Sequence, residues 1–176
     1  DYREIVKTLL RNFIIALLIA VLIIILTPLI NFSIQHFFNT STETQKLIST
    51  YINVRVFSVP AELIIYILVG FYLGIQKTNI SSLLIVTFSV LNIVFSSVLV
   101  LSYNLNVFGV ALGTLIASYI TLIIFTFISY NFIIKKFKII PRFEKLIVQS
   151  KIRKLLNINL DIFIRTLFLT FSFLWV

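Results

Sequence analysis

Residue types that build catalytic and metal sites are absent or scarce in this 176-residue chain. It has no cysteine, which excludes a disulfide framework, a thiolate nucleophile and a cysteine-ligated metal site. Its single histidine, His36, falls in a stretch that we expect to be a solvated outer loop. The sequence shows no nucleophile–base pair, phosphate loop or metal-ligand spacing, so it does not favour an enzyme, and we expect no cofactor.

Charge is also scarce. Only 12% of the residues are charged, 60% are hydrophobic and the mean hydropathy is +1.10. Residues 78–134 contain no Asp, Glu, Lys, Arg or His over 57 positions, a composition typical of an integral membrane protein. The net charge of +9 comes from basic residues near span ends, so we expect the lipid bilayer, not nucleic acid, as the partner.

The uncharged stretch is too long for one span of roughly 20 residues, and the polar cluster at 102–106 predicts a turn within it. We therefore predict an all-α multi-span bundle with four complete transmembrane helices and the start of a fifth. Pro28 is expected to end or kink the first span. The expected spans are 13–30, 51–75, 80–101 and 107–134, with polar loops at 31–50 and 76–79 and a fifth span starting near 158.

Basic residues predict the orientation. Residues 135–157 form a connector with eight basic residues and one acid, which we expect to include a short amphipathic segment after Pro141. The segments 1–11, 76–79 and 135–157 together hold twelve basic residues, so the positive-inside rule makes them cytoplasmic in a cell inner (plasma) membrane. The predicted organisation is 1–134 transmembrane, 135–157 connector and 158–176 a truncated span.

Two polar stripes are expected to meet near the middle of the bilayer. The stripes have helical spacing, and Asn92 and Thr114 both lie roughly 15–18 Å from the 102–106 turn at about 1.5 Å per residue. Polar groups at that depth are expected to face each other or a cavity. The stripes are Ser89, Asn92 and Ser96 on one helix, and Thr114, Ser118 and Thr121 on the next.

Glu62 is the most unusual residue within a predicted span. A carboxylate near the bilayer centre costs roughly 2.5–3.5 kcal/mol on insertion scales, so it is a candidate for transport or ion coupling. A structural, hydrogen-bonded glutamate is the alternative, and Arg55, seven residues earlier on the same face, is its expected partner. Asp161 and Arg165 form an i, i+4 pair that we expect near the start of the last helix.

All four glycines lie in two G-x-x-x-G patterns, Gly70 to Gly74 and Gly109 to Gly113. Small residues at this spacing let helix backbones approach closely, so both patterns predict helix packing and neither implies a ligand. The chain also lacks methionine and stops within an apolar run, so we expect an internal piece of a longer protein.

Several segments, in their order and spacing, resemble the MATE multidrug exporters, and most closely their DNA-damage-inducible F-like branch. The matching segments are Tyr51 to Arg55, Pro60-Ala61, Gly70 to Gln76, Asn92-Ile93, Gly109 to Thr114 and Asn159 to Thr166. The resemblance implies helices three to six of a two-lobe transporter, the connector between the lobes and the start of helix seven.

The resemblance further implies export of organic cations and other drugs, coupled to H⁺ or Na⁺, with the missing helices as partners. Family members with a polar coupling cluster carry an Asp where this chain has Ser96, whereas Asn92 and Thr114 match. The departure removes a titratable group, and we hypothesise that Glu62 partly replaces it. Two alternatives remain open: a lipid-linked oligosaccharide flippase of the same superfamily, and a small membrane scaffold or degenerate remnant that does not transport.

Overall fold

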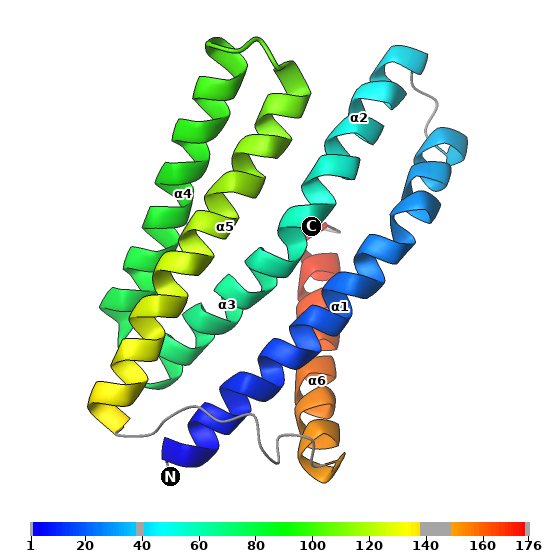
Figure 1. Ribbon diagram of the computed structural model, residues 1–176. Helices are drawn as coiled ribbons and strands as arrows, with labels where there is room; N and C mark the ends of the chain where they lie inside the picture. The colour runs from blue at the N-terminus through cyan, green and yellow to red at the C-terminus, as the bar shows by residue number, and fades with distance from the viewer. Residues whose placement is uncertain (1, 38–40, 138–148, 175–176) are drawn as a thin grey trace. The chain divides into compact units, whose positions relative to one another are not determined.

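The computed structural model describes residues 2–37, 41–137 and 149–174, and over these ranges the regular structure is helical (Figure 1). The chain divides into two compact units, Asp1–Pro141 and Arg142–Val176. Four helical segments of the described residues are long and apolar enough to cross a membrane. The prediction of an all-α membrane protein with four complete spans is therefore confirmed.

Helix α1 (Tyr2–Phe37) is much longer than the predicted span. It includes residues 2–11, which precede the predicted span, and it continues for nine residues past Pro28, so the expectation that Pro28 ends the helix is wrong. Proline removes one backbone hydrogen bond, but unwinding the chain in a bilayer would expose several more, so the helical path is retained. At about 1.5 Å per residue, the 36 residues extend roughly 54 Å, beyond a hydrocarbon core of about 30 Å.

The second span begins earlier in the sequence than predicted. Helix α2 (Thr42–Arg55), the short 3₁₀ turn η1 (Val56–Ser58) and helix α3 (Val59–Gly74) form one candidate span from Thr42 to Gly74. The predicted polar loop at 31–50 is therefore wrong. Ser41 is the N-cap of α2, and its hydroxyl accepts the Thr44 backbone N–H at 3.3 Å. Thr42, Glu43 and Thr44 belong to the first helical turn and not to a loop.

A helix break separates α2 from α3. Pro60 has no backbone N–H with which to satisfy the Val56 carbonyl, and the chain tightens into the η1 turn there. Side chains satisfy carbonyls at the break: Ser58 Oγ donates to the Arg55 carbonyl at 2.6 Å, and Tyr119 Oη donates to the Phe57 carbonyl at 3.1 Å. These bonds make an irregular turn tolerable inside a membrane span.

Helices α4 (Thr78–Leu101) and α5 (Asn106–Phe132) form the expected hairpin, within two residues of the predicted bounds. Asn104 and Asn106 adopt positive φ at its turn, a conformation that asparagine tolerates better than most residues. A π-helical turn, η2 (Ile133–Phe137), extends α5. Helix α5 lies between α4 and the α2–α3 span, and α1 packs along α3 (Figure 1). The largest side chains fully buried among these helices are Tyr72, Phe125, Leu68 and Leu84.

The second unit contains helix α6 (Gln149–Leu174). It begins inside the segment that the sequence assigns to the connector. Asp161 and Arg165 are both on α6, one helical turn apart. They lie near the middle of this helix, so the expectation that the pair lies near its start is wrong. The segment expected to lie on the membrane surface after Pro141 falls mainly within residues 138–148, outside the described residues.

Candidate functional site

A cluster of side-chain oxygens joins α4 to α5. The amide oxygen of Asn92 on α4 accepts hydrogen bonds from Thr114 Oγ1 at 3.1 Å and from Ser96 Oγ at 3.0 Å. Both hydroxyls also reach the Val110 carbonyl, from Thr114 at 2.9 Å and from Ser96 at 3.5 Å. Four oxygens without a formal charge thus converge between two membrane-spanning helices. The structure brings together Asn92, Ser96 and Thr114, three of the residues singled out in the sequence.

Close backbone contact at Gly113 makes this cluster possible. A Cβ atom built on Gly113 would lie 2.6 Å from the backbone nitrogen, the Cα and the Oγ of Ser96. One turn earlier, a Cβ on Gly109 would lie 3.2 Å from the Leu99 carbonyl carbon. The second G-x-x-x-G pattern therefore performs the helix packing that was predicted for it.

The rest of the two polar stripes does not meet. Ser89 is exposed, and Ser118 donates to the Leu115 carbonyl of its own helix at 2.8 Å. Thr121 is fully buried, and its hydroxyl has no hydrogen-bond partner within the described chain. Contact across α4 and α5 is close at the level of Ser96 and Gly113, so side chains near that level bond between the helices.

The second polar group spans the helix break. Arg55 forms a bidentate ion pair with Glu62, with Nη2 to Oε2 at 2.9 Å and Nη1 to Oε1, and Nη1 also bonds to Ser58 Oγ. The Arg55 and Glu62 side chains are 27% and 13% exposed. The i, i+7 spacing thus predicts the right partner for Glu62. Within the described chain, Glu62 makes no hydrogen bond to the Asn92 cluster.

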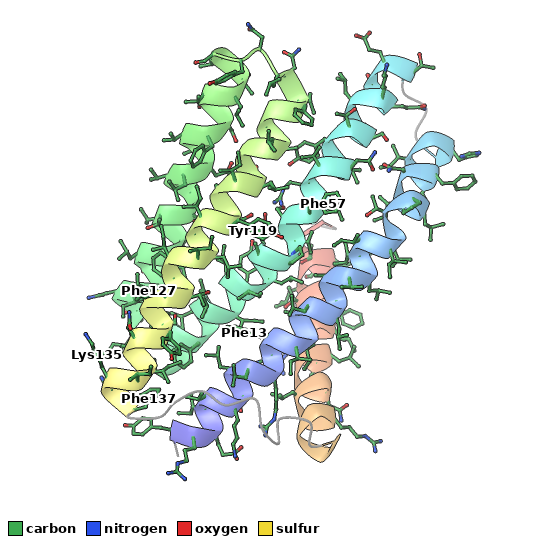
Figure 2. All side chains as sticks on the ribbon, viewed as in Figure 1. Phe13, Phe57, Tyr119, Phe127, Lys135 and Phe137 are labelled. Carbon is green, nitrogen blue, oxygen red and sulfur yellow. The ribbon has the colours of Figure 1, made fainter. Side chains whose placement is uncertain are left out.

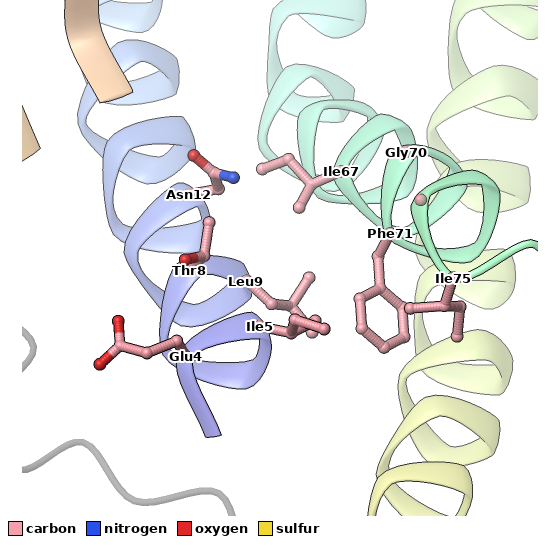
Figure 3. Close-up of a pocket in the computed structure, with 10 residues that line it drawn as sticks. Glu4, Ile5, Thr8, Leu9, Asn12, Ile67, Gly70, Phe71 and Ile75 are labelled. Atoms are coloured by element: carbon pink, nitrogen blue, oxygen red, sulfur yellow. The ribbon is translucent and has the colours of Figure 1, made fainter. Parts of the chain in front are cut away.

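The first G-x-x-x-G pattern does not pack as predicted. A Cβ built on Gly70 or Gly74 would meet no atom within 4 Å. Both glycines instead line a cavity of about 470 Å³ between α1 and α3 (Figure 3). The expectation of close helix packing is wrong for this pair, because small residues at helical spacing do not reveal whether a neighbouring helix covers them.

The structure also contains polar contacts that the sequence did not predict. Tyr72 Oη and Ser129 Oγ lie 2.8 Å apart in the buried contact of α3 with α5, and Asn31 Nδ2 donates to Asn53 Oδ1 at 2.7 Å between α1 and α2. The buried tyrosine gave no periodic signal. His36 lies in α1 and not in a loop, with Nδ1 3.0 Å from the Phe32 carbonyl. Among the described residues, no group of three or more His, Cys, Asp or Glu side chains could hold a metal ion.

Comparisons with known proteins agree on one family. The MatE family model matches residues 1–98. The chain is 33% identical to DNA damage-inducible protein F of Escherichia coli over 95% of its own length, and 31% identical to the multidrug export protein MepA of Staphylococcus saprophyticus over 62%. The chain spans about a third of the first relative, 36%, and 24% of the second. No solved structure matches significantly. The chain therefore belongs to the MatE family, and it is a multi-pass membrane protein.

Proposed function

We propose that the chain is part of a secondary-active exporter that moves small organic cations and other drugs out of the cell in exchange for H⁺ or Na⁺. The oxygen cluster of Asn92, Ser96 and Thr114 carries the proposal. Polar groups within a membrane span are costly and commonly mark a transport pathway. The name of the MepA relative, a multidrug export protein, supports drugs as substrates.

The basic end of the first unit faces the cytoplasm in this proposal, in the cell's inner (plasma) membrane. Tyr2 and Phe137 stack with ring centroids 4.4 Å apart, so the start of α1 and the end of η2 lie at the same end. Lys135 and Phe137 are labelled at this end of the unit (Figure 2). Its basic residues include Arg3, Lys7, Lys77, Lys135 and Lys136, in agreement with the positive-inside rule.

The oxygen cluster has no carboxylate, and the family resemblance implies that Ser96 stands where members with a polar coupling cluster carry an Asp. We propose that Glu62 supplies the titratable group and that Arg55 is its counter-cation. A proton arriving at Glu62 would neutralise the carboxylate and weaken its hold on the Arg55 guanidinium. Because the pair spans the break between α2 and α3, its release would loosen the turn that joins them.

The test is the accumulation of a fluorescent organic cation, such as ethidium, in cells that express the full-length protein and lack other exporters. Replacing Asn92 by Ala removes the acceptor of two hydrogen bonds worth about 1 kcal/mol each, so export should fall roughly 5- to 30-fold. The matched control is Ser89→Ala, one turn away on α4 and exposed. Normal export by Asn92→Ala at equal expression would overturn the role of the cluster.

The variant Glu62→Gln tests the proposed role of Glu62 in ion coupling independently of the role of the Asn92 cluster. This variant should abolish efflux driven by a pH gradient, because glutamine cannot release or bind the proton. Efflux at the wild-type rate in Glu62→Gln would rule out Glu62 as the coupling group, while leaving the cluster untouched.

A further inference from the structure

The cavity between α1 and α3 has an apolar interior and a polar edge (Figure 3). Helix α1 contributes Ile5 and Leu9, which point toward α3, and Glu4, Thr8 and Asn12, which are spaced four residues apart at the edge of the cavity. Helix α3 contributes the floor, with Gly70 and Gly74 beside the Phe71 ring and Ile75. A space with an apolar interior and a polar edge suits an amphiphilic molecule better than water or a purely apolar one.

The floor of the cavity leaves room for an extended apolar group. A Cβ on either glycine would meet nothing within 4 Å, so the cavity reaches the backbone of α3 over a full turn. Its volume of about 470 Å³ falls within the range of small-molecule sites, roughly 300–1,000 Å³. In a bilayer, the most abundant molecules that can lie along such a floor are lipid acyl chains.

The charges at the mouth of the cavity determine which kind of lipid headgroup can bind there. Lys77 follows the floor residue Ile75 by two positions, is exposed and forms no ion pair within the part of the chain that the structure describes. Glu4 would favour a cation, but its carboxylate lies 3.9 Å from Lys7 Nζ and 3.6 Å from Arg11 Nη1 and is compensated. The potential at the mouth therefore attracts an anion, as in basic pockets between transmembrane helices that hold lipid headgroups.

We propose that this cavity is a binding site for one anionic phospholipid. The acyl chain lies on the Gly70–Gly74 floor against Phe71 and Ile75. The phosphate lies at the mouth near Lys77. Thr8, one turn or about 6 Å deeper than Glu4, stands at the level of the ester groups. The site is distinct from the Asn92 cluster on α4 and α5, and the proposal does not depend on the transport function.

The experiment is native mass spectrometry of the full-length protein in detergent, titrated with phosphatidylglycerol or with phosphatidylcholine. The wild type should retain one phosphatidylglycerol more tightly than phosphatidylcholine. Gly70→Leu and Gly74→Leu fill the floor without meeting a neighbouring atom at Cβ, and each should weaken that binding at least fivefold. Leu73→Phe is the matched control, because it adds bulk to an exposed side of the same turn and should leave binding unchanged.

A second variant tests the headgroup. Lys77→Gln should reduce the preference for phosphatidylglycerol over phosphatidylcholine, with less effect on phosphatidylcholine itself. An unfolding temperature close to that of the wild type shows that each variant is folded.

Three results would overturn the proposal. Equal phosphatidylglycerol binding by the wild type and both leucine variants would mean that bound lipid is unspecific. The absence of any tightly held lipid in the wild type would mean that other protein covers the cavity. If Gly70→Leu weakened the binding of ethidium and left the binding of phosphatidylglycerol unchanged, the cavity would be a drug subsite.

Discussion

Gly113→Ala is the sharpest test of the α4–α5 contact. The added Cβ would lie 2.6 Å from the Ser96 nitrogen and Cα, which are backbone atoms and cannot rotate away. Forcing extra atoms into a packed contact typically costs 1–3 kcal/mol, and a backbone clash belongs near the upper limit of about 3. Alanine regains about 1 kcal/mol of helix propensity over glycine. The net destabilisation should be about 2 kcal/mol.

The same substitution on α3 provides the control. Gly70→Ala gains the same helix propensity, and its Cβ meets no neighbour, so stability should stay constant or rise by up to about 1 kcal/mol. For an unfolding unit of roughly 150–250 residues, 2 kcal/mol corresponds to a fall of roughly 4–8 °C in unfolding temperature. Thermal unfolding of the two variants in detergent measures the difference.

The contact also predicts an effect on the cluster. The Cβ that Gly113→Ala adds would approach Ser96 Oγ as closely as it approaches the backbone, so the hydrogen bonds around Asn92 should be displaced and export should fall together with stability. Equal unfolding temperatures for Gly113→Ala and Gly70→Ala would refute the close approach of α4 and α5 and the reasoning built on it.

Two further predictions concern the helix break and the orientation. Arg55→Ala leaves the Glu62 carboxylate without its guanidinium partner and should cost about 2–3 kcal/mol, below the roughly 3–5 kcal/mol of a fully buried pair because Arg55 is 27% exposed. Arg55→Ala/Glu62→Ala should be more stable than Arg55→Ala alone, and purely additive effects in thermal unfolding would contradict the ion pair. For the orientation, a cysteine placed at Tyr103 should react with a membrane-impermeant maleimide in intact cells, whereas one at Asn79 should not; labelling of Asn79→Cys alone would reverse the assignment.

The sequence predicted the α4–α5 hairpin and its polar cluster well. A long uncharged stretch with one polar interruption leaves few alternatives, and the depth of Asn92 and Thr114 follows from counting residues from the turn. The partner of Glu62 was also predictable, because Arg55 lies on the same helical face and a lone carboxylate in a span requires a partner.

Other features could not be predicted because they depend on neighbours that periodicity does not identify. The polar residues between Thr42 and Thr50 look like a loop, yet with Ser41 as the N-cap they form the first turns of α2. Gly70 to Gly74 and Gly109 to Gly113 have the same pattern, but α4 covers only the second pair. The cavity at the first pair depends on the position of α1, which no local signal gives.

The most direct test of the central claim is the rate of organic-cation transport by the full-length protein in proteoliposomes under an imposed ion gradient. Asn92→Ala and Ser89→Ala are compared at equal protein content with the wild type. If the oxygen cluster between α4 and α5 is part of the transport machinery, Asn92→Ala loses most of the gradient-driven rate and Ser89→Ala keeps it. Wild-type transport by Asn92→Ala, or an equal loss in both variants, would contradict the claim.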